Sequence, residues 1–145
     1  MKKKLMASIV ASGAAIAGIL SAAGPASAAV ITSNCGSGAQ MCLFYHSLSN
    51  PGGLGAEYGN SNNVKSFNPN VNGGNTYEFK SGVYGTSGAG QTVWNNAGGA
   101  GDYSPSQNFA VWYNSSWTGA YDVVPYGKKI SLTRTYNQDA SMGWI

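Results

Sequence analysis

Residues 109–127 read FAVWYNSSWTGAYDVVPYG, and this stretch decides the fold. Its first five residues are aromatic, β-branched or small, as a strand prefers. Asn-Ser-Ser then interrupts the run with turn formers, and a second strand follows from Ala120 to Val124, ended by a proline. We expect a β-hairpin with Trp117 folded over it and Gly119 beside the ring, because a glycine lets backbone pass closely under an aromatic side chain.

A second copy of this pattern lies upstream. Residues 42–47 (CLFYHS) match residues 110–115 (AVWYNS), and each is followed by a turn, a glycine and a short strand. Polar turns at 95–98 and 137–141 then lead into a final strand in each copy. The sequence therefore predicts an internal repeat. The first copy is longer, and its surplus is an Asn-, Gly- and Ser-rich region between Gly59 and Gln91 that is either a tolerated surface loop or an insertion with contacts of its own.

The first 28 residues have the character of a secretory signal peptide. A run of three lysines precedes the apolar stretch Leu5–Leu20, and Ala26-Ser27-Ala28 is a small-x-small cleavage site. The apolar stretch is shorter than the ~20 residues that a membrane span needs. We expect export of residues 29–145 as one extracellular domain that is not bound to the membrane.

Charge argues against a nucleic-acid partner. The whole chain has 8 basic and 5 acidic residues, but three of the lysines belong to the predicted signal peptide. Residues 29–145 therefore carry five residues of each sign and no net charge. No basic patch is large enough for the many phosphate contacts that nucleic-acid binding needs. We expect a monomer, and we interpret Lys128-Lys129 as a solvated turn.

Cys35 and Cys42 are the only cysteines, and in an exported chain this pair predicts a disulfide. Its ring is short, so the loop-closure estimate is roughly 2–3 kcal/mol of stabilisation at best. The alternatives are a metal pair or a reactive thiol. Only His46 could serve as a further soft ligand, and two cysteines with one histidine do not complete a structural zinc site.

The sequence after the signal peptide predicts an all-β fold. No window longer than ten residues has a 3.6-residue apolar period, and Gly, Asn and Ser punctuate each short apolar run. Short strands at this spacing predict a sandwich or a small barrel. The strands that we expect are 41–45, 56–58, 76–79, 92–94, 109–113, 121–124 and 142–145.

The duplicated hairpin resembles a known fold. Tyr113, Trp117 and Gly119 are similar to the folded-hairpin signature of the βγ-crystallins, one residue shorter than its commonest spacing. The resemblance implies a βγ-crystallin-like sandwich of two Greek-key motifs in one domain. The first motif would span about 35–103 and the second about 108–145.

The first copy departs further from that signature. It has Tyr45 and Gly53, but Leu48 or Pro51 stands where an aromatic residue is expected. Within the superfamily, the chain resembles the secreted actinobacterial proteins of peptidase inhibitor family I36. The motifs that carry this resemblance are Cys35 to Tyr45, Asn95 to Ala97, Tyr121 to Gly127 and Tyr136 to Ile145.

This family resemblance implies an inhibitor of secreted peptidases, above all metallopeptidases. In such a mechanism a rigid β-scaffold offers an exposed loop to the peptidase cleft, and main-chain hydrogen bonds supply affinity. The two candidate loops are the disulfide-closed segment and the Asn-rich insertion Asn60–Asn75. Their candidate contact residues are Gly38, Ala39, Gln40, Met41, Asn62 and Asn63.

We do not expect an enzyme. A serine or cysteine nucleophile needs a base and a third group that positions it. His46 is the only histidine, Ser47 is too close to it for easy pairing, and Cys42 is expected in the disulfide. The five scattered carboxylates include no evident acid and base pair, although such pairs are spatial.

Calcium is the one cofactor that the sequence suggests, and no other is expected. Microbial βγ-crystallins bind it through two consecutive Asn or Asp residues, two variable residues and then Ser or Thr, and calcium prefers oxygen ligands. Two turns partly match, with Gln in the second place of the later turn and Gly in the last place of the earlier one. Residues 62–66 also match. Turn formation alone explains the same residues. The candidate ligands are Asn95, Asn96, Asn137, Gln138 and Ser141. A cell-surface module with aromatic rings that stack on sugars is a further alternative.

Overall fold

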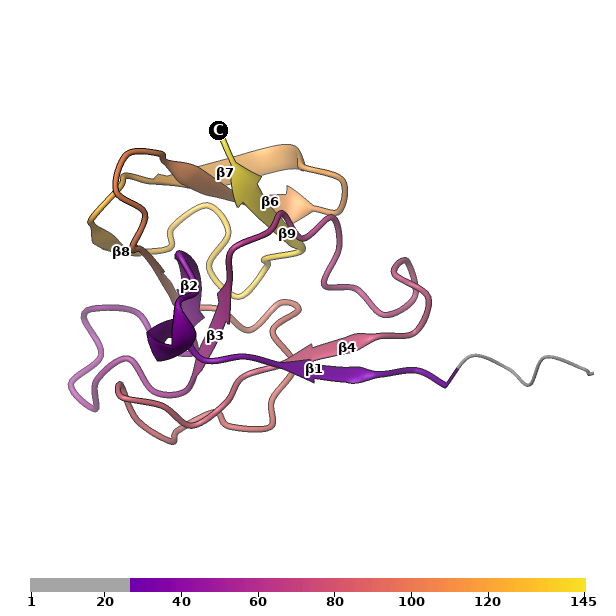
Figure 1. Cartoon of the computed structure of the whole chain (residues 1–145), viewed down its shortest axis with the longest axis horizontal. Coiled ribbons are helices and arrows are strands. Elements are labelled where there is room, and N and C mark those ends of the chain that lie inside the picture. Colours follow the sequence, from indigo (N-terminus) through magenta and orange to yellow (C-terminus); the bar gives the residue numbers. More distant parts are fainter. Residues whose placement is uncertain (1–26) are drawn as a thin grey trace, which may run out of the picture.

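Two antiparallel sheets, one short parallel strand pair and a short 3₁₀ helix are the regular secondary structure of residues 27–145, the part of the chain that the computed structural model describes (Figure 1). The first sheet has the order β3-β2-β5-β8 and the second has the order β7-β6-β9. The predicted all-β class is confirmed. The strand bounds are β1 Val30–Thr32, β2 Met41–Phe44, β3 Glu57–Asn60, β4 Thr76–Glu78, β5 Gly99–Asp102, β6 Phe109–Asn114, β7 Thr118–Val124, β8 Lys129–Ser131 and β9 Ser141–Trp144.

The two halves of the chain exchange a segment between the sheets. Strand β8 belongs to the second half but pairs with β5 in the first sheet, where Ala100 faces Ile130. Val64 belongs to the first half but forms an antiparallel bridge with Met142 of β9 in the second sheet. Each half therefore completes the sheet of the other, which is the arrangement of two intertwined Greek-key units. The predicted sandwich of two such units is confirmed.

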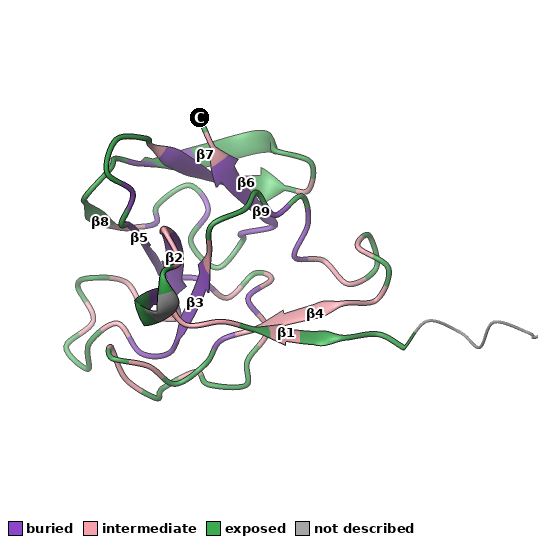
Figure 2. Cartoon of the chain, viewed as in Figure 1, coloured by how far each residue is buried: buried purple, intermediate pink, exposed green. Residues whose placement is uncertain are grey.

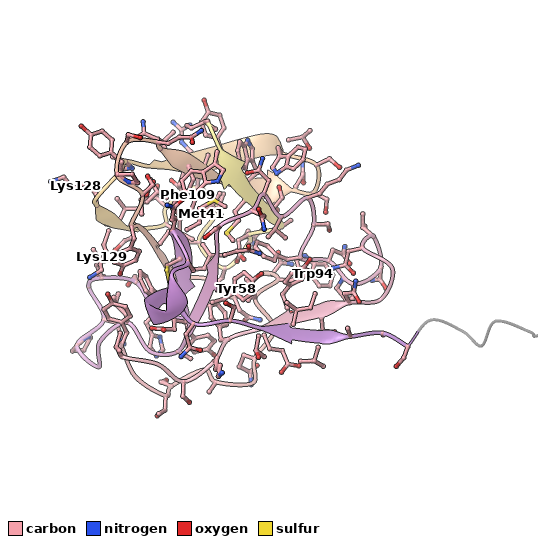
Figure 3. All side chains as sticks on the ribbon, viewed as in Figure 1. Met41, Tyr58, Trp94, Phe109, Lys128 and Lys129 are labelled. Atoms are coloured by element: carbon pink, nitrogen blue, oxygen red, sulfur yellow. A yellow bond between two sulfur atoms is a disulfide. The ribbon has the colours of Figure 1, made fainter. Side chains whose placement is uncertain are left out.

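The core lies between the two sheets (Figure 2). Met41 and Leu43 of β2 and Phe109 and Val111 of β6 have no exposed surface. Figure 3 shows Met41, Tyr58 and Phe109 inside the molecule and the two lysines 128 and 129 at its periphery. Large apolar side chains of this kind each contribute about 1.5–3 kcal/mol when buried, so the alternating inward positions of β2 and β6 stabilise the sandwich.

An aromatic cluster closes one side of the core. Tyr58, Phe67 and Tyr77 pack edge to face, with ring centroids 5.4–5.8 Å apart. Each such pair adds about 0.5–1.5 kcal/mol beyond the area that it buries. Phe67 and Tyr77 come from the region that the sequence marked as surplus, so this region supplies core as well as surface.

The surplus therefore makes contacts of its own. Strand β4 pairs in parallel with β1, and Phe79 after it is buried. Of the two alternatives for the surplus, a tolerated surface loop does not describe 60–75, because Val64 and Phe67 within it are buried and donate their backbone N–H groups to Met142 and Ala140. Residues 63–67 are the exchanged segment of the first half, and the additional residues begin after it.

Three strands lie outside the expected ranges, although the polar turn at 95–98 does predict a strand where β5 begins. Strand β5 reads Gly-Ala-Gly-Asp and lacks the β-branched and aromatic residues of a typical strand. A Cβ atom at Gly101 would lie 3.1 Å from the Phe44 ring, so a larger residue there would require this ring to shift by a few tenths of an ångström. Strands β1 and β8 have three residues each. The expected strand 92–94 is limited to one bridge between Thr92 and Glu78.

The second hairpin has Trp117 folded over it, as the sequence predicts. Trp117 has a φ of 58°, and its indole Nε1–H donates to the carbonyl oxygen of Met142 at 3.2 Å. The glycine under the indole is Gly143 of β9, where a Cβ would lie 3.2 Å from Nε1. Gly119 instead leaves room for the amide of Asn114, at 2.7 Å from its hypothetical Cβ.

The equivalent glycine of the first hairpin is Gly55. Its φ is +75°, and a Cβ there would lie 2.9 Å from the ring of His46, which corresponds to Asn114. The sequence alignment placed this role at Gly53, which has 3.9 Å to its nearest neighbour. That assignment is wrong by two residues because the first hairpin has a longer loop.

The predicted signal peptide, residues 1–28, lies outside the described residues apart from Ser27 and Ala28. Within residues 27–145, no helix has the length and apolar character needed to cross a membrane.

Candidate functional site

The two polar turns at 95–98 and 137–141, which correspond in the predicted repeat, meet where the halves of the molecule join. Asn95 and Asn137 hold corresponding positions, and both adopt positive φ, 60° and 53°. The backbone N–H of Asn95 donates to the Asp139 carbonyl at 3.0 Å, and the N–H of Asn137 donates to the Ala97 carbonyl at 2.9 Å. These reciprocal hydrogen bonds fix the relation between the halves, since each turn satisfies the backbone of the other.

A polar cavity of about 230 Å³ opens beside these turns. Its walls combine Tyr45 and His46 of the first hairpin with Asn96, Tyr136 and Asn137 of the two turns. Tyr45 is held in place by Phe79, with ring centroids 5.7 Å apart. The cavity offers amide, hydroxyl and imidazole groups, and no carboxylate of the described chain lines it, so it suits a small neutral polar group.

His46 in this cavity has a serine partner that the sequence did not indicate. Its Nε2 lies 2.9 Å from the hydroxyl of Ser87, forty-one residues away. In a catalytic triad the base is oriented by a third group, usually a carboxylate. Among the described residues, no carboxylate hydrogen-bonds this imidazole. The pair therefore lacks the positioned acid, and it joins the first hairpin to the loop 81–90.

The calcium candidates come together only in part. Asn96 and Asn137 line the cavity, whereas Gln138 is exposed. The Ser141 hydroxyl already donates to the Asn114 carbonyl at 2.7 Å and accepts from the Trp117 amide at 3.2 Å. The described residues hold no cluster of three or more His, Cys, Asp or Glu that could bind a metal ion. The one carboxyl group of these turns, that of Asp139, is buried and accepts the N–H of Ala97. Amide and hydroxyl oxygens alone fit calcium poorly, so we derive no role for the ion here.

Two buried aspartates have pKa values shifted in opposite directions. Burial raises the pKa of Asp139 well above its usual value, although Oδ1 accepts the N–H of Ala97 at 2.9 Å. Burial also acts to raise the pKa of Asp122, but hydrogen bonds from the backbone and hydroxyl groups of Thr135 and Thr133 outweigh it and lower the pKa. Neither carboxyl group lines the polar cavity, so both belong to the framework.

The disulfide between Cys35 and Cys42 is present. Within its ring, residues 35–37 form a 3₁₀ turn and Gly38 has a φ of 91°. The loop is docked beside the end of β3: Ser61 donates from its hydroxyl to the Gly38 carbonyl at 3.2 Å and accepts the Gln40 N–H at 3.3 Å. The segment is thus a packed turn and not an extended strand.

The proposed contact residues of this loop differ in exposure. Gly38 is exposed, Ala39 and Gln40 are half-buried, and Met41 has no exposed surface because it points into the core from β2. In the second candidate loop, Asn62 and Asn63 are exposed, but the side-chain oxygen of Asn63 accepts the N–H of Trp144 at 2.9 Å. Asn63 thereby attaches the exchanged segment to β9.

Sequence reasoning missed a braced turn at residues 82–85. Gly82 and Gly85 exchange two backbone hydrogen bonds of 3.2 Å, and Val83 at the tip is 80% exposed. Tyr84 anchors the turn through edge packing on Phe44, with centroids 5.0 Å apart. The spacing of two glycines around a valine and a tyrosine was the signal in the sequence, since glycines at both ends allow a tight turn.

Tyr84 is fixed from a second side as well. Its hydroxyl lies 2.5 Å from that of Tyr103, and the ammonium of Lys129 lies 4.7 Å from the Tyr84 ring centroid. A cation over an aromatic face adds about 0.5–1 kcal/mol at an exposed site. Lys129 is therefore part of the support for this turn and not simply a solvated residue.

Comparison with known proteins gives fold similarity alone. No protein-family profile matches the sequence, and no curated protein matches it significantly. Two solved structures are similar. One, described as "Evolution of the eye lens beta-gamma-crystallin domain fold", has a TM-score of 0.48 and 13% identity over 79% of this chain and 92% of that chain. The other, the N-terminal domain of protein S, has a TM-score of 0.46 and 14% identity over 74% of this chain and 96% of that chain. Both TM-scores lie below 0.5, so the assignment of fold rests on the strand topology.

Proposed function

We propose that this chain is an exported, non-catalytic binding protein that inhibits a peptidase by docking the turn 82–85. The observation that carries the proposal is Val83, an 80% exposed aliphatic side chain at the tip of a rigid turn. Exposed apolar side chains held in one conformation lose little entropy on binding, and they can enter an apolar pocket of a partner.

The framework under the turn favours docking over chemistry. Tyr84 packs on Phe44, and its hydroxyl group is hydrogen-bonded to that of Tyr103, so the turn cannot change its position without breaking both contacts. The one histidine and its serine partner have no positioned acid in the described part of the chain. A metallopeptidase is the target class that the family resemblance suggests.

Inhibition assays test this proposal directly. The protein, purified from the medium of a secreting host, should inhibit a thermolysin-like metallopeptidase at micromolar concentration. Val83→Asp should weaken inhibition at least tenfold, because a carboxylate in an apolar pocket of the partner is desolvated without a compensating hydrogen bond. Val71→Asp is the matched control, since Val71 is 59% exposed on another loop. Absence of inhibition by the wild type would overturn the proposal.

Export is part of the same proposal and has a separate test. If residues 1–28 are removed during secretion, N-terminal sequencing of the protein from the medium should begin at Ala29. A protein that is retained in the cell with Met1 intact would contradict export.

A second candidate is binding to a cell-surface polysaccharide. Trp112 of β6 and Tyr121 of β7 are register partners on one face of the second sheet, with ring centroids 6.1 Å apart, and Tyr121 is 44% exposed. Flat exposed rings can stack on sugar faces. Tyr121→Ala should reduce sedimentation with insoluble cell-wall polysaccharide severalfold, whereas Tyr126→Ala, which removes an exposed ring from a turn, should not. Equal sedimentation of all three proteins would remove this candidate.

A further inference from the structure

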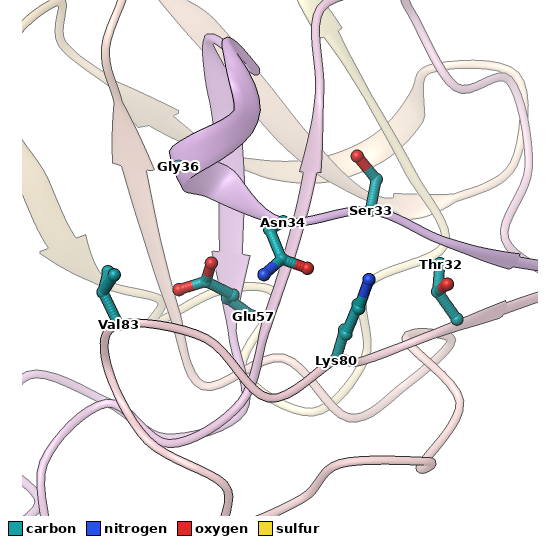
Figure 4. A pocket seen from close by; sticks show the side chains of 7 residues that line it. All are labelled: Thr32, Ser33, Asn34, Gly36, Glu57, Lys80 and Val83. Carbon is teal, nitrogen blue, oxygen red and sulfur yellow. The ribbon is translucent and has the colours of Figure 1, made fainter.

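A second cavity, of about 540 Å³, lies between the segment that follows β1 and the surplus region of the first half (Figure 4). Thr32, Ser33 and Gly36 line it from the end of β1 and the segment after it, and Lys80 and Val83 line it from the surplus region. The two sides are connected by Asn34, whose amide Nδ2 donates to the Ser81 carbonyl at 3.3 Å. This cavity is separate from the polar cavity beside His46, and none of the predicted site residues lines it.

Glu57 of β3 also lines this cavity, although its side chain has no exposed surface. Its Oε1 accepts the backbone N–H of Cys35 at 3.0 Å, while Oε2 is buried and has no hydrogen-bond partner among the described residues. A buried carboxylate oxygen without a donor is costly, because it has lost its water and gained no replacement. The site therefore lacks a hydrogen-bond donor at Oε2.

The space around this carboxylate is closed on one side and open on the other. A Cβ at Gly82 would overlap the Glu57 carboxyl group, so Gly82 packs its backbone directly against it. Gly36, which also lines the cavity, has no neighbour within 4 Å of its hypothetical Cβ. The turn that contains Gly82 thus covers the carboxyl group, and a side chain at Gly36 would have room at the cavity.

Lys80 does not supply the missing donor. It lines the same cavity and is exposed, but no ion pair joins it to Glu57 in the described part of the chain. Figure 4 shows its ammonium directed toward Thr32 and Ser33, on the far side of Asn34 from the Glu57 carboxylate. Oε2 of Glu57 therefore has no cationic partner among the described residues, and its side chain lines the cavity.

We propose that this cavity binds a cationic hydrogen-bond donor, a guanidinium or alkylammonium group, through Oε2 of Glu57. Charge-assisted hydrogen bonds to a carboxylate are about twice as strong as neutral ones, and a guanidinium has N–H groups to spare for nearby hydroxyl and carbonyl oxygens. The volume accommodates one such group with its alkyl chain. The proposal does not depend on peptidase inhibition.

Calorimetric titration of the full-length protein with agmatine, a guanidinium ligand that has no carboxylate, tests this site. The wild type should bind. Glu57→Gln keeps the acceptor for Cys35 but removes the charge, and it should weaken binding by roughly thirtyfold or more. Lys80→Met removes from the cavity a positive charge that repels the cationic ligand, and it should strengthen binding of agmatine by roughly threefold. Glu78→Gln, which removes a carboxylate outside the cavity, is the control and should bind like the wild type.

A second variant, Gly36→Arg, keeps the test decisive if Glu57→Gln does not fold. Gly36→Arg adds a guanidinium at a position with open space, and this internal cation should compete with agmatine and weaken its binding. Unfolding midpoints show whether each variant is folded. Undiminished binding by both Glu57→Gln and Gly36→Arg, or weaker binding by Lys80→Met, would overturn the proposal.

The cation could be a free molecule or the side chain of a partner. A blocked tripeptide, acetyl-Gly-Arg-Gly-amide, separates these sources. Agmatine binding without peptide binding identifies a small free cation, and peptide binding of equal or greater affinity identifies an arginine side chain. Both results support the site, and failure of both ligands to bind the wild type overturns it.

Discussion

The carboxyl oxygen Oδ1 of Asp139 accepts the backbone N–H of Ala97 at 2.9 Å, and these two residues hold corresponding positions in the two halves of the molecule. Residues that correspond in a repeat face each other only where the halves meet. One position is a methyl group and the other is a carboxyl group, and both are buried. The junction is therefore asymmetric in chemistry although it is symmetric in backbone.

Replacement of Asp139 by asparagine should flatten the dependence of stability on pH. Burial raises the pKa of Asp139 in the folded protein above its ordinary value of 3.8. The folded state then binds more protons than the unfolded state, so the wild type loses stability as pH rises from about 3.8 toward the raised pKa. The amide side chain of Asp139→Asn keeps an oxygen that can accept from Ala97, and it does not titrate. The free energy of unfolding, measured in urea from pH 4 to 8, should favour the variant increasingly as pH rises. A constant difference across this range would contradict the argument.

Replacement of Asp122 by alanine should destabilise the protein increasingly as pH rises, the opposite of the effect expected at Asp139. Burial acts to raise the pKa of this carboxyl group, but four hydrogen bonds from Thr135 and Thr133, at 2.8–3.0 Å, lower it below 3.8. A lowered folded pKa means that this stabilisation is present above the ordinary pKa and is lost as pH falls. We expect Asp122→Ala to lose about 3 kcal/mol of unfolding free energy at pH 6, because hydrogen bonds to a charged acceptor are lost together. The difference should shrink in urea titrations below pH 3.8.

A substitution at Gly55 should separate backbone strain from crowding. Gly55→Ala meets two costs: a positive φ, and a Cβ that would lie 2.7 Å from the carbonyl oxygen of Ser87. Gly73→Ala meets only the first, since its φ is +80° and nothing lies within 4 Å. We expect losses of about 3 kcal/mol and about 1 kcal/mol respectively, measured by denaturant unfolding. Equal losses of unfolding free energy would contradict this argument, because they would show that the residues around Gly55 move aside for the added methyl group at no energetic cost.

Calcium should have little effect on thermal stability. The one carboxyl group of the two turns, that of Asp139, is buried and hydrogen-bonded to Ala97, which leaves amide and hydroxyl oxygens as ligands, so we expect a dissociation constant above about 1 mM. At about 1 mM calcium, the melting temperature should then rise by less than about 2 °C. Calorimetric scans with and without calcium measure this shift, with magnesium as the ionic-strength control. A rise of about 5 °C or more with calcium alone would restore the calcium-binding module as a function.

The repeat was readable in the sequence because its strands carry periodic aromatic and β-branched residues. Strands β2 and β6 were both located to within one residue, and the polar turns at 95 and 137 were aligned correctly. The turn at 95–98 predicts a strand after it, but the range of β5 could not be predicted, because a Gly-Ala-Gly-Asp segment has no preference of its own for strand and is held by its neighbours β2 and β8.

The features beside the two cavities were harder to read. The hydrogen bond between His46 and Ser87 and the cavity at Glu57 both join residues that lie more than twenty positions apart. Local sequence patterns predict which residues form a strand, but they do not predict which distant loop packs against it. The exchange of Val64 between sheets was hidden for the same reason, and an Asn-rich segment looked like a simple surface loop.

Substitutions of the neighbouring residues Asn62 and Asn63 distinguish a structural role from a role in docking. The side-chain oxygen of Asn63 accepts the N–H of Trp144, eighty-one positions away, whereas Asn62 is exposed and its backbone N–H donates to the side chain of Asn60. Asn63→Ala should therefore lower the unfolding free energy by about 1–2 kcal/mol, and Asn62→Ala should change it by less than about 0.5 kcal/mol. Denaturant unfolding measures both, and inhibition assays on the folded variants complete the comparison. Because docking is assigned to the turn at Val83, neither substitution should weaken peptidase inhibition, and a loss of inhibition in Asn62→Ala would return the docking site to this segment.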